Sequence, residues 1–218
     1  SLGLDTGDRA GLRARLGSSA AAGRFGFASD LAAARAEIDA IDLAALPAQA
    51  RTSHEVLAWF AARASEIVRA PYGGFDSYPI PYTLTQLTGS YQSVPDFLDS
   101  THPLATGADA EAWLSRMTDM AANIGHEVDR SRAEAAQGVI PPAFVIAKTL
   151  AQTRAAREDA ARGTGSGMAT SLERKARAAG VNGEWASRAG RIAAGPITAA
   201  LDRQIAHLES LAPRATNE

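Results

Sequence analysis

Apolar residues return every three or four positions along most of this chain, which is the spacing of helices that bury one face. The alternation of β-branched and polar residues that marks half-buried strands does not appear. The pattern predicts helices at residues 29–41, 47–70, 106–138, 141–162, 170–180 and 182–211. We therefore expect an all-α fold, an antiparallel bundle-like array of helices with one long loop rich in Pro and Tyr.

Capping and breaking residues indicate where these helices begin and end. Thr106 or Asp109 opens the longest helix, and Gly138 follows its last turn as a left-handed cap. Thr170 with Glu173 matches a capping box, which predicts a helix start there. A Gly-Pro pair at 195–196 predicts a kink in the last helix. The apolar stripe of the second helix comprises Val56, Leu57, Phe60, Ala64, Ile67 and Val68, and the buried face expected in the fourth comprises Phe144, Ile146, Ala147, Leu150 and Ala151.

The chain divides into two parts. Residues 1–28 are rich in Gly, Ala, Arg and Ser and predict an irregular lead-in, and residues 29–218 form a helical domain. Within that domain, five prolines punctuate the stretch from Pro71 to Pro103, which also holds all four tyrosines. A structured loop of this length is often functional, and Tyr suits the wall of a cleft. The alternative is that these aromatic side chains fill a gap between helices.

Charge and cysteine content narrow the function classes. With 22 basic and 24 acidic residues, the net charge of −2 favours neither nucleic acid nor an anionic membrane as a partner. The absence of cysteine excludes thiolate zinc sites, iron–sulfur clusters, disulfides and cysteine nucleophiles. No apolar run in the sequence reaches the ~20 residues that a membrane span requires. At 218 residues, the chain can bury a core without disulfides or a metal.

Two His-Glu pairs, at 54–55 and 126–127, could begin a zinc-binding helix. Such a helix needs a second His four residues after the first, so that both imidazoles reach one metal ion. Ala58 and Arg130 occupy those positions, so neither pair predicts a metal site. The run Gly163–Gly167 lacks the Lys and the preceding strand of a phosphate-binding loop, and we interpret it as a hinge between helices.

Four segments together resemble a large bacterial family known as domain of unknown function 885. They are Tyr82–Gly89, Val94–Leu98, His102–Leu104 and Asp109–Met117. The resemblance runs from about Asp30 to Ala215. Members of this family are longer than this chain and resemble helical zinc metallopeptidases, with the zinc ligands and a catalytic Glu in the C-terminal half. The resemblance implies that this chain is the N-terminal helical part of such a bacterial protein.

As implied by the resemblance, the helices form one wall of the substrate cleft of a zinc-dependent peptidase-like hydrolase. Tyr72, Tyr82 and Gln86 are then the candidate contacts to a peptide-like substrate. No catalytic residue or metal ligand is expected in this chain, and zinc is expected only in a longer parent protein. Whether the chain belongs to an enzyme stays open.

The expected partners are the missing C-terminal half of the parent or, through surface left uncovered, a second copy. The compartment stays open between the cytoplasm and an exported, periplasmic location. The alternative function is a stand-alone helical module for binding or protein interaction.

Overall fold

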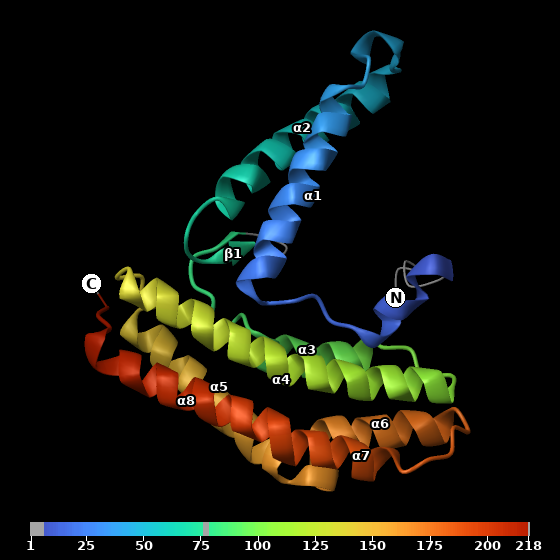
Figure 1. The fold of residues 1–218 in the computed structure, drawn as a ribbon, viewed down its shortest axis with the longest axis vertical. Coiled ribbons are helices and arrows are strands. Elements are labelled where there is room, and N and C mark those ends of the chain that lie inside the picture. Colours follow the sequence, from blue (N-terminus) through green and yellow to red (C-terminus); the bar gives the residue numbers. More distant parts are fainter. Residues whose placement is uncertain (1–6, 76–78, 218) are drawn as a thin grey trace.

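The computed structural model describes residues 7–75 and 79–217, and its helices form an arm and a bundle (Figure 1). In the arm, α1 (Ala21–Asp39) runs antiparallel to α2 (Ala48–Val68). The bundle consists of α3 (Ser90–Ser100), α4 (Gly107–Ala136), α5 (Ala143–Ala161), α6 (Gly167–Ala178), α7 (Trp185–Ile192) and α8 (Thr198–Leu211). The predicted all-α class is confirmed.

Short elements connect these helices. The 3-10 helices are η1 (Gly7–Ala14), η2 (Leu43–Ala45), η3 (Gly163–Gly165) and η5 (Ala212–Arg214). After α2, the two-residue strands β1 (Gly74–Phe75) and β2 (Pro79–Ile80) pair antiparallel, with Gly74 opposite Ile80 and Phe75 opposite Pro79. In the described residues, no helix is long and apolar enough to cross a membrane.

The start of α4 follows the sequence signal. Thr106 Oγ1 accepts a hydrogen bond from the Asp109 backbone N–H at 3.3 Å. The Asp109 carboxylate in turn accepts one from the Thr106 N–H at 2.9 Å, which completes a capping box. Gly138 follows the helix with a φ of 84°, as expected for a left-handed cap.

Two predicted helix starts are wrong. The first helix begins at Ala21 and not near Ser29, so only part of the predicted lead-in is irregular; residues 1–6 lie outside the described part. Helix α6, predicted at residues 170–180, begins at Gly167, whose N–H donates to the Asp159 carboxylate at 3.0 Å. Thr170 lies inside this helix and donates to the Ser166 carbonyl, so it is no cap.

The Pro-rich segments are more helical than predicted. Helix α3 incorporates Tyr91 and Pro95, so the loop ends at Gly89, and Tyr78 lies outside the described residues.

Pro196 lies in a π-helical turn, η4 (Ala193–Ile197), between α7 and α8. A proline has no N–H to donate, and the wider turn absorbs the missing bond. The predicted interruption of the last helix is confirmed.

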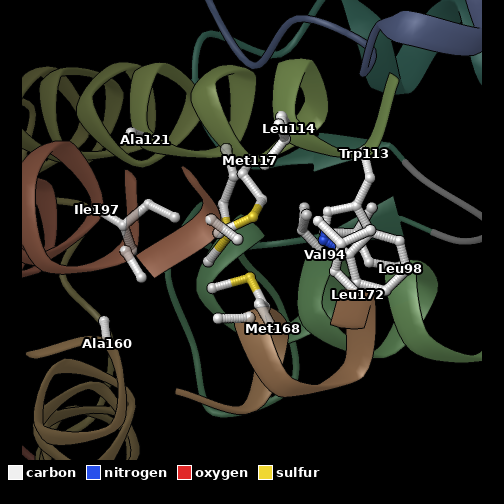
Figure 2. Close-up of a cluster of buried hydrophobic side chains, with 14 of the residues drawn as sticks. Val94, Leu98, Trp113, Leu114, Met117, Ala121, Ala160, Met168, Leu172 and Ile197 are labelled. Atoms are coloured by element: carbon white, nitrogen blue, oxygen red, sulfur yellow. The ribbon is translucent and has the colours of Figure 1, made fainter. Parts of the chain in front are cut away.

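The main core lies where α4 meets α3 and α6. Figure 2 shows Trp113 and Met117 of α4 pointing toward Met168 and Leu172 of α6, with Leu98 of α3 beside them. All five side chains are buried, and each such burial contributes about 1.5–3 kcal/mol. A second cluster joins the ends of α4, α5 and α8 through Ala135, Ile146, Leu150, Leu208 and Leu211.

Only part of the predicted apolar stripe of α5 is buried. Phe144, Ala147 and Ala151 are exposed, although Ile146 and Leu150 are buried as predicted. The buried face also includes Val145, Thr149 and Thr153. Both threonines satisfy their hydroxyls by donating to the carbonyl four residues earlier, at 2.7 and 2.9 Å. A satisfied hydroxyl can be buried at little cost, which a pattern of apolar residues does not reveal.

The stripe of α2 is divided in the same way. Ala61, Ala64 and Val68 are buried, and the first two form a small cluster with Leu31 of α1. Val56, Leu57 and Phe60 of the predicted stripe are exposed, because the helix that packs along α2 in the described residues, α1, covers one side of it.

Candidate functional site

Helix α4 carries a row of buried polar side chains beside its apolar stripe. Asp109, Arg116, Asn123, Glu127 and Glu134 follow each other at spacings of four or seven, which place them on one side of the helix. Such residues are buried only when they have partners. In Figure 1, α4 lies between other helices of the bundle and the segments that connect to the arm, and these segments supply many of the partners.

Hydrogen bonds to Asp119 and Asn123 help to fix the segment that leads into α1 against α4. The Leu16 N–H donates to Asp119 Oδ2 at 2.9 Å, and the Ser19 N–H donates to Asn123 Oδ1 at 3.0 Å. Asn123 Nδ2 donates to the Gly17 carbonyl at 2.8 Å. One side chain of α4 therefore satisfies a donor and an acceptor of an extended backbone.

Glu127 fixes the start of α3 to α4. Its carboxylate accepts from the Ser90 N–H at 3.0 Å, from Ser90 Oγ at 2.6 Å and from Ser19 Oγ at 3.0 Å. The side chain is 5% exposed. Burial raises the pKa of Glu127, and the hydrogen bonds from Ser90 and Ser19 and the charge of Arg130 oppose that rise. The preceding Gly89 has a φ of 120°, which favours glycine, and a Cβ there would lie 3.0 Å from the Tyr91 ring.

Glu134 does the same for the loop between α2 and α3. It accepts from the Gly73 N–H at 2.9 Å and from both the N–H and the hydroxyl of Thr83. Arg130 donates to the Gly73 carbonyl at 2.5 Å. Gly73 has a φ of 65°, and a Cβ there would lie 2.2 Å from the Ile80 carbonyl oxygen, so only glycine fits.

These three segments enclose a groove with a cavity volume of about 610 Å³, which we name the loop groove. Its size falls in the range of ligand sites. Hydroxyl and amide groups line it together with the buried carboxylate of Glu127 and the guanidinium groups of Arg15 and Arg130. The lining residues are Arg15, Leu16, Gly17, Ser19, Ile80, Thr83, Leu87, Thr88, Gly89, Ser90, Ser93, Val94, Phe97, Asn123, Glu127 and Arg130.

The substrate contacts predicted from the sequence lie close to this groove along the chain but do not line it. Tyr72 is 43% exposed after α2, and Tyr82 is partly exposed beside Thr83. Gln86 is also partly exposed, and its Oε1 atom is buried without a hydrogen-bond partner among the described residues. Their role in substrate binding stays a prediction. Tyr91 is buried and its hydroxyl lies 2.8 Å from Gln152 Oε1, so it fills a gap between helices.

The four histidines are distributed over the molecule. His54 contacts the Ile38 carbonyl in the arm, and His207 contacts Ser131 Oγ between α8 and α4. Buried His102 accepts at Nδ1 from Arg116 at 2.6 Å and donates from Nε2 to the Asp109 carbonyl at 2.9 Å. His126 lies on α4, and its Nδ1 has no partner among the described residues. In that part of the chain, no three His, Asp or Glu side chains are placed to hold a metal ion.

Sequence reasoning missed Asn123 and Glu134, and it considered Glu127 only as part of the His-Glu pair at 126–127. Charged residues on a long helix usually face solvent, so the apolar stripe of α4 alone gave no reason to choose among its carboxylates. The available signal was their spacing, because 123, 127 and 134 fall on one side of the helix and adjoin the apolar stripe.

Comparisons with known proteins identify the family of the chain and a protein of similar fold. The model of the bacterial family of unknown function DUF885 matches residues 1–218. The chain belongs to this family. The fold also matches the crystal structure of a protein described as "the putative lipoprotein from Colwellia psychrerythraea", with a TM-score of 0.81 and 14% identity. The match covers 95% of this chain and 36% of that one, so this DUF885 chain spans about a third of the length of its structural relative. No relative was found among curated proteins.

Proposed function

We propose that this DUF885 chain is the helical wall of a substrate cleft in a longer peptidase-like hydrolase, and that the loop groove holds part of a peptide-like substrate. The observation that carries the proposal is the groove itself. The lead-in to α1, the loop before α3 and the start of α3 converge there, and buried side chains of the sequence-distant helix α4 fix all three. A binding surface of fixed shape loses little entropy when it takes up a ligand.

The lining of the groove suits an extended peptide. Its serines and threonines can donate to carbonyls and accept from N–H groups of a peptide backbone. Arg130 is half-buried and has five N–H donors, one of which reaches the Gly73 carbonyl. A guanidinium in this setting favours a carboxylate, at the end of a peptide or on an acidic side chain.

Zinc chemistry would have to come from another part of the polypeptide. The described residues do not fit a zinc ion, because no group of three ligand side chains comes together. The role of this chain is therefore to bind and orient the substrate. Tyr72, Tyr82 and Gln86 remain candidates for contacts beyond the groove.

The test uses the polypeptide encoded by the complete gene, assayed on a panel of peptides with and without a zinc chelator. Hydrolysis that stops with the chelator supports a metal-dependent peptidase. Arg130→Gln should raise KM about tenfold at nearly unchanged kcat, since one charge-assisted hydrogen bond is lost in ground state and transition state alike. Arg130→Lys should recover part of the loss.

Arg132→Gln is the matched control, because Arg132 lies on the same helix, is exposed and pairs only with Asp129 in the described structure. It should change neither constant. If the metal-loaded polypeptide cleaves none of the peptides, the peptidase hypothesis is wrong. If it binds peptides without cleaving them, the result favours the alternative of a helical binding module.

A further inference from the structure

The arm exposes an unusual set of apolar side chains. Val56, Leu57, Trp59 and Phe60, which we name the α2 apolar face, are between 45% and 67% exposed. Ile41 and Leu43, at the tip of the arm, are also exposed. Single exposed apolar residues are common, but a contiguous set on one helix marks a surface that another element covers.

Most of this face is distinct from the side that packs on α1. Successive residues of an α-helix are rotated by about 100°. Val56 and Trp59 therefore lie more than about 100° around the helix from the buried side formed by Ala61, Ala64 and Val68, whereas Leu57 lies on the edge nearest α1. Figure 1 shows that the arm stands away from the bundle helices.

The comparison with the longer relative indicates what could cover this face. The match leaves out 5% of this chain (100 − 95), or about 11 of 218 residues, whereas the arm from Ala21 to Val68 has 48 (68 − 21 + 1). Most of the arm therefore has a counterpart in the relative. The other 64% of that chain (100 − 36) has no counterpart here and is long enough to supply a covering surface.

We propose that the α2 apolar face is the docking surface for the C-terminal remainder of the same polypeptide. The occupant is an apolar face of that remainder, and the exposed tip residues extend the contact. The proposal shares with the proposed function only the longer polypeptide and needs no peptidase activity.

A second copy of this chain fits the face less well. Side chains of this kind bury about 100 Å² each, so the four together with Ile41 and Leu43 bury about 600 Å² per copy. A stable dimer needs about 800 Å² per partner. A tethered segment needs less area, because the linker keeps its effective concentration high, in the millimolar range for a short link.

The chain contains no cysteine, so a single introduced cysteine reports the exposure of one position. Val56→Cys probes the face, and Arg51→Cys is the matched control on the far side of α2, about 140° away. The labelling rate of each thiol is measured in the 218-residue chain and in the polypeptide of the complete gene, whose other cysteines are replaced.

We expect the Val56→Cys thiol to react at least about tenfold more slowly in the longer polypeptide, because labelling then needs a local opening. The Arg51→Cys thiol should react at similar rates in both. Equal rates for Val56→Cys, or a gene that ends at residue 218, overturn the proposal. Protection that appears in the 218-residue chain as its concentration rises assigns the face to a second copy and also overturns it. None of these results depends on peptide hydrolysis.

Discussion

Replacing Glu127 by Ala tests whether the buried carboxylates of α4 hold the loop groove together. The substitution removes the acceptor of the Ser90 N–H at the start of α3 and of the hydroxyls of Ser90 and Ser19. The Ser90 N–H is buried and belongs to the first turn of the helix, so no carbonyl of α3 can replace the lost acceptor.

The cost follows from these three bonds. A buried N–H left unpaired costs about 1–3 kcal/mol, and each hydroxyl bond contributes about 1 kcal/mol. Part of this returns, because the variant no longer buries a carboxylate whose pKa burial raises. We therefore expect the free energy of unfolding to fall by about 2–4 kcal/mol, which lowers the Tm by roughly 5–15 °C in a chain of this size. Glu127→Gln keeps one acceptor and should cost less, about 1–2 kcal/mol.

The assay is urea denaturation followed by circular dichroism, with thermal melting alongside. Asp129→Ala is the matched control, since Asp129 lies two residues further on the same helix, is exposed and pairs with Arg132 at 3.3 Å. An exposed ion pair of this kind contributes less than about 1 kcal/mol. If Glu127→Ala costs no more than Asp129→Ala, the carboxylate does not hold the segments and the argument for a fixed groove is refuted.

Three further predictions concern other parts of the fold. Gly73→Ala should lower the free energy of unfolding by more than about 2 kcal/mol, because its Cβ would clash with the Ile80 carbonyl. Gly138→Ala, which has open space around it, should lower it by about 1 kcal/mol, and urea denaturation of both variants tests the difference. Burial lowers the pKa of His207 to about 4, so the unfolded state takes up its proton first and stability is lost as pH falls from about 6.5 to 4. The loss should be about 2–3 kcal/mol smaller in His207→Asn, measured by denaturation across that range, and equal slopes would contradict it. Amide hydrogens of α1 and α2 should exchange faster than those of α4 and α8, because the arm has a small core; equal protection would mean that the arm and the bundle unfold together.

The sequence predicted the long elements well because their signals are local. Some residues start, end or interrupt a helix through bonds and dihedral angles at their own position. The structure shows a capping box at Thr106 and Asp109, a left-handed cap at Gly138 and a π-helical turn at Gly195-Pro196. The predicted start of α6 was wrong because the Gly167 N–H is capped by Asp159, which lies in the preceding helix. The local Thr170–Glu173 pattern contains no information about a capping residue that comes from another helix.

The first part of the loop was predicted at its place, and one of the two roles considered for its aromatic side chains, filling a gap between helices, holds for Tyr91. Tyr91 belongs to a helix and fills a gap, and the groove is lined by small hydroxyl residues and by Arg130 more than by aromatic side chains. Prolines and glycines locate a loop because they restrict or free the backbone. They carry no information about which side chains a distant helix brings against it.

By itself, the sequence determined the helical class, most helix ends and the family, since all three depend on residues near one another in the chain. Only the tertiary structure decided which faces are buried, because burial depends on what packs alongside. It buried Glu127 and Glu134 of α4 with backbone partners 37 to 61 residues away, and it left Val56 and Trp59 of α2 exposed on an arm that the bundle does not cover. The physical reason is the same in both cases. The free energy of burying a side chain depends on which groups surround it. Those groups belong to distant segments, which the local sequence pattern cannot place.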